Sequence, residues 1–246
     1  MKKLLSTLLA LLFAAGIFAQ NQNDVQKNGS QNQSIVYFTR DVSSAGLMKV
    51  YRALNQKIEG SVGIKVSFGG PDEEVLQPEL LRDLVRTTGG TMFDGNGLSG
   101  NRRTSEMNLS YARRHGFTEI GKCIIHSGGT DESHYHSTPA DVLEKSFADA
   151  AKAALDYKKN WAFINVLDDI EPNDNCRGAK NLGKIGIIAS SDIVALEQCT
   201  LDFVIEKADV DSAAKAEWKA AHRVGMIEQL EKLGGGTRNY RLVEVK

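Results

Sequence analysis

Short apolar runs alternate with amphipathic stretches along most of this chain. The runs are rich in Val, Ile and Phe and end at Gly, Pro or Asn, which is typical of strands; we predict strands at 34–39, 62–68, 91–94, 122–126, 161–167, 185–189 and 240–245. Between them apolar residues recur every three or four positions, which predicts helices at 42–56, 78–85, 104–114, 141–158, 191–207 and 213–233. Because strand and helix alternate, we predict a single α/β domain with a mostly parallel sheet and helices on both faces.

The first residues follow a different pattern. Lys2 and Lys3 precede an apolar run that reaches Ala19, and a polar stretch follows. This layout is typical of a secretory signal peptide. The alternative is a membrane anchor, but the apolar run is shorter than the ~20 residues that a spanning helix needs. We therefore predict a signal peptide at 1–19, a disordered lead-in at 20–33 and the α/β domain at 34–246, in an exported protein that is periplasmic or secreted.

The net charge of the chain limits the classes of partner that we expect. The whole chain has a formal net charge of −1, and removal of Lys2 and Lys3 leaves 28 basic against 31 acidic residues. A nucleic-acid-binding protein would carry a basic stripe, so we predict no nucleic-acid partner. No second apolar run of comparable length follows, so we also predict no transmembrane segment after signal cleavage. The expected partner is a small molecule or a redox partner.

Polar side chains follow several predicted strands. In an open parallel sheet, ligands collect beyond the carboxyl ends of the strands. Lys65 and Ser67 lie at the end of the second strand, and Asp94, Asn96 and Arg103 lie at or after the third. We predict a catalytic role for Lys65, which is costly to bury without a partner or ligand, and ligand binding by Ser67, Asn96 and Arg103. The alternative for Lys65 is an edge strand on which it faces water.

A second group of residues has side chains of the kinds that bind metal ions. His126 ends the fourth strand, and Asp168 opens an acidic loop that reaches Cys176. Imidazole, carboxylate and thiolate are all ligands for transition metals. We predict that His126, Asp168 and Cys176 bind a metal ion, and that His126 also moves protons. An acidic turn without any ligand is the alternative reading of the loop.

Three cysteines are present, Cys123, Cys176 and Cys199, so at least one cannot form an intramolecular disulfide. Cys199 lies among apolar residues of a predicted helix and is expected to be a buried thiol. The chain has no Gly-x-Ser-x-Gly, His-Glu-x-x-His or Cys-x-x-Cys pattern, so the familiar hydrolase, zinc-protease and thioredoxin signatures are missing.

Several stretches together resemble the family known as domain of unknown function 362. They include GKCIIHSGGTD at 121–131, WAFINVLDDIEPNDNC at 161–176 and IGIIASSDIVALEQCTLDF at 185–203. The segments 34–70, 78–96 and 102–120 resemble its earlier part, so the resemblance covers nearly the whole predicted mature chain. Members are often labelled iron–sulfur centre proteins, which implies a metal-associated or redox-related function.

The chain departs from that family in two respects. Cys176 matches one of two cysteines that relatives carry after the fifth strand, and Asp174 takes the place of the other. A long glycine-rich middle segment is missing, because the regions that end at Ile120 and begin at Gly121 are joined directly. Three cysteines cannot build a four-cysteine cluster within one chain. Three hypotheses follow: a metal-associated or redox enzyme, a non-catalytic small-molecule or anion-binding protein, and an inactive remnant.

Overall fold

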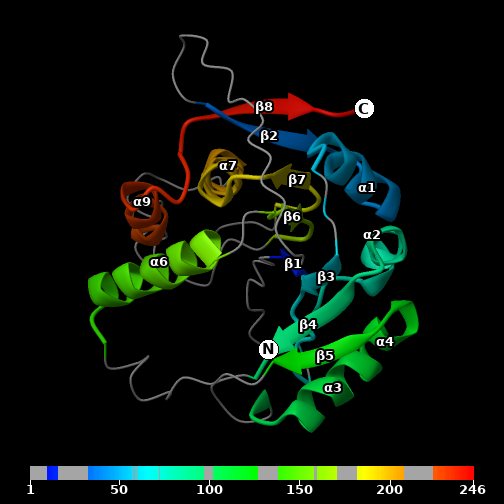
Figure 1. The fold of residues 1–246 in the computed structure, drawn as a ribbon. Helices are drawn as coiled ribbons and strands as arrows, with labels where there is room; N and C mark the ends of the chain where they lie inside the picture. Colours follow the sequence, from blue (N-terminus) through cyan, green and yellow to red (C-terminus); the bar gives the residue numbers. More distant parts are fainter. Residues whose placement is uncertain are drawn as a thin grey trace.

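The computed structural model describes residues 10–15, 33–56, 58, 60–71, 73–96, 102–126, 138–157, 160–170, 182–207 and 224–246. The strands form one sheet in the order β5-β4-β3-β1-β6-β7-β2-β8 (Figure 1). Their bounds are β1 Ala10–Ala15, β2 Ser34–Thr39, β3 Ser61–Lys65, β4 Thr91–Gly95, β5 Cys123–His126, β6 Phe163–Leu167, β7 Gly186–Ser190 and β8 Tyr240–Glu244.

Six of the eight strands in the described part run in one direction, as a mostly parallel sheet predicts, but the sheet is mixed because four of its seven strand pairings are antiparallel. β3, β4 and β5 run parallel to one another, and β2 runs parallel to β8. β1 is antiparallel to both β3 and β6, so β6 has the direction of β3. β7 is antiparallel to β6 and β2, a reversal that the sequence pattern did not indicate. The carboxyl ends of β3, β4, β5 and β6 therefore meet at one edge of the sheet, where ligands collect in folds of this kind.

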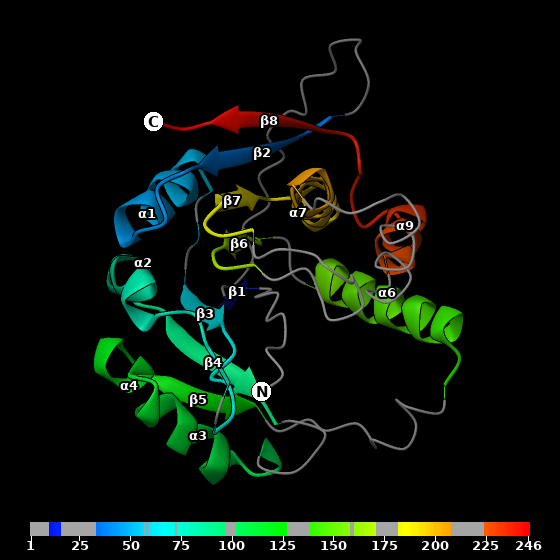
Figure 2. The ribbon, with the colours of Figure 1, turned by 180° about the vertical axis from the view of Figure 1, so that it is seen from behind.

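Helices cover both faces of the sheet, which confirms that prediction (Figures 1 and 2). One face carries α1 Ser44–Ala53, α2 Arg82–Thr88, α3 Ser105–Arg114 and α4 Phe117–Ile120, with the 3-10 turn η1 Pro78–Leu81 before α2. The other face carries α6 Ala140–Tyr157, α7 Ile193–Lys207 and α9 Gly225–Lys232. The predicted final helix at 213–233 is represented by α9; residues 208–223 lie outside the described part.

The two largest apolar cores of the described residues, one on each face, hold these layers together. On β7, Ile187 packs into the core beneath α1, while its neighbour Ile188 packs into the core beneath α7. On β6, Ile164 packs into the core beneath α1, and Phe163 packs into the core beneath α7. Because successive strand residues point to opposite faces, a run that is apolar at every position is buried on both sides, as the sequence predicted.

Capping residues set the start of α1 and of α3 and the end of α2. The Ser43 hydroxyl accepts a hydrogen bond from the Gly46 N–H at 3.1 Å at the start of α1. Thr104 does the same for the Met107 N–H at 3.2 Å and begins α3. Gly89 ends α2 in the left-handed conformation, with a φ of 62°. That conformation favours glycine, which explains why α2 ends there rather than at the predicted residue 85.

Six residues of the predicted signal peptide form a strand. β1 pairs in register with residues 61–64 of β3 and with residues 163–164 of β6. The rest of the predicted signal peptide and the lead-in to residue 32 lie outside the described residues. In the part of the chain that the structure describes, no helix has the length and apolar character needed to cross a membrane.

Candidate functional site

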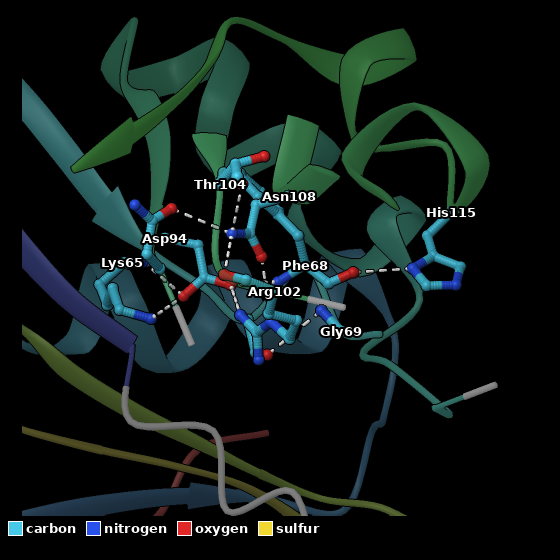
Figure 3. Close-up of polar contacts among 11 residues, drawn as sticks. Lys65, Phe68, Gly69, Asp94, Arg102, Thr104, Asn108 and His115 are labelled. Carbon is cyan, nitrogen blue, oxygen red and sulfur yellow. Dashed lines mark hydrogen bonds and ion pairs between the residues drawn. The ribbon is translucent and has the colours of Figure 1, made fainter. Parts of the chain in front are cut away.

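A buried carboxylate binds two cationic side chains at the carboxyl ends of β3 and β4. Asp94 is 4% exposed. Its Oδ1 lies 2.7 Å from Nζ of Lys65, and its Oδ2 lies 2.5 Å from Nη2 of Arg102. Figure 3 shows both cationic groups directed at this carboxylate from different parts of the chain. We call Lys65, Asp94, Arg102 and Asn108 the Asp94 cluster.

Backbone groups fix the orientation of the Asp94 carboxylate. The Phe68 N–H donates to Oδ2 at 2.8 Å, and the Gly95 N–H donates to Oδ1 at 2.8 Å. Each carboxylate oxygen thus accepts one charged and one backbone hydrogen bond. Such charge-assisted bonds are about twice as strong as neutral ones, so the two cations are held at defined positions.

Asn108 holds Arg102 from α3. This side chain is fully buried; its Oδ1 accepts a bond from Nε of Arg102 at 3.1 Å. Its Nδ2 donates to the backbone oxygens of Arg102 and Thr104 at 2.7 and 2.9 Å and to Oδ1 of Asn96 at 3.1 Å. Asn108 therefore fixes the turn that carries Arg102 as well as the guanidinium itself.

Two hydrogen bonds fix the turn after β3, one at the N–H and one at the carbonyl oxygen of Phe68. Phe68 donates its N–H to Asp94, and its carbonyl oxygen lies 2.7 Å from Nδ1 of His115 (Figure 3). Because a carbonyl oxygen can only accept, Nδ1 carries the proton of this bond. Gly69 follows with a φ of 71°, and its N–H donates to Oγ of Ser67 at 3.3 Å. Ser67 thus shapes the turn beside the cluster.

The cluster has an excess of positive charge and donors. Two cations share one carboxylate, so one positive charge is not compensated within the cluster. The side chain of Lys65 is 31% exposed and that of Arg102 is 22% exposed. An ammonium group has three N–H donors and a guanidinium has five, whereas the bonds described above use one of Lys65 and two of Arg102. The arrangement can therefore bind an anion.

The structure places the predicted site residues in different surroundings. Lys65, Ser67 and Asn96 lie in or beside the Asp94 cluster, whereas Arg103 is exposed next to it. Sequence reasoning chose Arg103 from an adjacent pair of arginines and passed over Arg102. It also noted Asp94 only as a strand-end residue and missed Asn108, for which the sequence offered no signal beyond its place on α3.

The predicted metal ligands are not brought together. His126 is exposed at the end of β5, and Asp168 follows β6, where its Oδ2 lies 3.3 Å from Nζ of Lys184. β5 and β6 are four strand positions apart, which corresponds to about 19 Å. Cys176 lies outside the described residues. Within the ranges that the structure describes, no three His, Cys, Asp or Glu side chains are grouped as metal ligands.

The two described cysteines are both shielded. Cys199 is fully buried on α7, as predicted. Cys123 is partly buried on β5, and burial raises the pKa of its thiol to about 11. Because the thiolate is the form that reacts and binds metals, Cys123 is a poor nucleophile and a poor ligand near neutral pH.

Comparison with known protein families gives a match over one stretch of the chain. Residues 121–202 match a family model described as a domain of unknown function (DUF362). The matched segment runs from just before β5 into α7 and contains His126, Asp168 and Cys176. No curated protein and no solved structure matches the chain.

Proposed function

We propose that this protein, which matches a DUF362 family model over residues 121–202, binds a small anionic molecule, a carboxylate or a phosphate, through Lys65 and Arg102. The observation that carries the proposal is the pair of cations held on one buried carboxylate at the carboxyl ends of two parallel strands. It corresponds to the non-catalytic small-molecule or anion-binding hypothesis from the sequence.

The fixed geometry supports anion binding more strongly than it supports a purely structural role. A structural ion pair needs only one cation for one carboxylate, and here the second cation leaves a net positive charge. The Asp94 carboxylate and the Asn108 amide already hold Arg102 in place, so an incoming anion would lose little entropy in ordering it. Arginine presents a planar fork of donors that suits carboxylate and phosphate oxygens.

Calorimetric titration with inorganic phosphate and with acetate tests the proposal. We expect Arg102→Met and Lys65→Met each to weaken binding about tenfold or more, because each removes one charge-assisted contact. Arg103→Met is the matched control, since Arg103 is the exposed neighbour of Arg102; we expect little change. Equal losses in all three variants would show a general charge effect, and no binding by the unchanged protein would rule out an anion site of this type.

We also propose that the protein is exported, on the strength of the basic and then apolar pattern at its N-terminus. Intact mass measurement of protein recovered from the periplasm or medium tests this. We expect a chain that begins near Gln20. Recovery of a full-length chain from the cytoplasm alone would contradict export.

A metal-associated or redox function at His126 and Asp168 stays a prediction from the sequence. The separation of β5 and β6 means that these two side chains cannot bind one ion in the described arrangement. A metal at either residue would need ligands from elsewhere, so the anion site is the better-supported proposal.

A further inference from the structure

The Asp94 cluster sets its two cations at the spacing of one carboxylate group. Nζ of Lys65 binds Oδ1 of Asp94, and Nη2 of Arg102 binds Oδ2 (Figure 3). Because both oxygens belong to one planar group, the ammonium and the guanidinium lie side by side at one edge of the sheet. A second carboxylate that approaches them from the side away from Asp94 can therefore give one oxygen to each cation.

Both cations keep hydrogen-bond donors for such a group. The bonds of Arg102 to Asn108 and Asp94 use its Nε and its Nη2. Among the described residues, neither N–H group of Nη1 has an acceptor, and Lys65 uses one of its three N–H groups, on Asp94. The two side chains are 31% and 22% exposed, so an incoming ligand can reach these donors.

Backbone N–H groups around the cluster are already used within the protein. Those of Phe68 and Gly95 each donate to Asp94 at 2.8 Å, and that of Gly69 donates to Oγ of Ser67 at 3.3 Å. Phosphate sites commonly surround the anion with free backbone N–H groups of a glycine-rich turn or a helix start. At these three positions the cluster offers no such cradle, so an anion there depends on the two cationic side chains.

The charge of the cluster favours a ligand group with one negative charge. Lys65 and Arg102 carry two positive charges and Asp94 carries one negative charge, so one positive charge is left within the cluster. A carboxylate balances that charge. A phosphate dianion would leave a negative charge beside the Asp94 carboxylate, which is 4% exposed, and an uncompensated charge is costly in a buried place.

We propose that the ligand of the Asp94 cluster is a carboxylate rather than a phosphate, with one oxygen on Nη1 of Arg102 and the other on Nζ of Lys65. This inference rests on the anion-binding function proposed above and names the chemical class of its ligand. The carboxylates of Asp94 and of the ligand then enclose the two cations in a ring of alternating charges. The planar fork of an arginine suits two carboxylate oxygens, whereas a phosphate has further oxygens that these two cations leave without a charged donor.

Titration of the full chain with three anions at pH 8 tests this inference, followed by the NMR signals of the Gly69 and Gly95 amides beside the cluster. Acetate is a planar monoanion, methanesulfonate is a tetrahedral monoanion, and inorganic phosphate is tetrahedral and mostly a dianion at this pH. We expect acetate to bind about tenfold more tightly than phosphate, and methanesulfonate to bind more weakly than acetate.

The outcomes separate the ligand class from anion binding itself. Phosphate that binds as tightly as acetate would overturn the carboxylate assignment and leave the proposed anion binding in place. Equal binding of acetate and methanesulfonate would also overturn the assignment, because charge alone would then select the ligand. Absence of binding by all three anions would contradict both the assignment and the proposed function.

A variant assigns the preference to Arg102. Arg102→Lys keeps a positive charge but removes Nη1 and the planar fork, so we expect the affinity for acetate to fall about tenfold and its advantage over phosphate to disappear. Arg103→Lys, at the exposed neighbouring position, should retain the preference. A preference for acetate that persists in Arg102→Lys would overturn the proposed contact. The comparison of the three anions on the unchanged chain decides the ligand class even if Arg102→Lys does not fold.

Discussion

Replacing Asp94 with alanine is expected to lower the free energy of unfolding by about 3 kcal/mol. The carboxylate is 4% exposed and accepts bonds from two cations and two backbone N–H groups. Its removal leaves the buried Phe68 N–H without an acceptor and leaves Lys65 and Arg102 as adjacent like charges. Because both cations retain some contact with water, the loss belongs at the lower end of the range for a broken buried ion pair. Urea denaturation measures it.

Asp141→Ala is the matched control for that experiment. Asp141 pairs with Lys145 one turn along α6 at 3.4 Å, and both side chains are more than half exposed. Surface pairs of this kind contribute less than about 1 kcal/mol. A similar small change in both variants would mean that the Asp94 cluster does not hold the ends of β3 and β4 together.

Replacing Gly186 with alanine is expected to destabilise the protein by about 3 kcal/mol or more, because a methyl group has no room there. Gly186 begins β7 with a φ of 151°. A Cβ atom at this position would lie 2.3 Å from the carbonyl oxygen of Thr39 and 2.4 Å from the ring of Phe38. The backbone at the end of β2 would have to move, which disturbs its pairing with β7. The midpoint of thermal unfolding reports the effect.

Gly183→Ala separates crowding from backbone conformation in this comparison. Gly183 has a φ of 60°, and apart from its chain neighbours no atom of the described residues lies within 4 Å of where its Cβ would be. Alanine at position 183 would be disfavoured only by the left-handed backbone conformation, which costs about 1 kcal/mol. If both variants lost the same stability, close packing between β7 and β2 would not be the reason for the glycine.

The periodic pattern of the chain predicted most of the fold. Runs such as 185–189 are apolar at every position, and the two faces of β7 are indeed buried against different helices. The caps at Ser43 and Thr104 depend on side-chain chemistry within a few residues of each helix start, which is local information. The antiparallel direction of β7 could not be predicted, because the direction of a strand depends on which neighbour it pairs with rather than on its own residues.

The candidate site was predicted in part for a similar reason. Lys65 was selected because a lysine in an apolar strand needs a partner, and the structure supplies Asp94. Arg102 and Arg103 are adjacent in the sequence, and only the turn before α3 decides which one reaches the carboxylate. His126 and Asp168 both follow strands, but strand order separates them. Strand order arises from long-range pairing, which local sequence does not encode.

The order of strands also means that the segment matched by the family model is not a self-contained folding unit. Residues 121–202 include β5, whose strand partner is β4, and β6 and β7, which lie on the far side of β3 and β1. Cut out alone, β5 would have no neighbour, and β7 would expose the edge that pairs with β2. The stretch that sequence comparison detects is thus narrower than the smallest piece able to fold, and transplanting it into another protein would carry over the residues without the sheet that positions them.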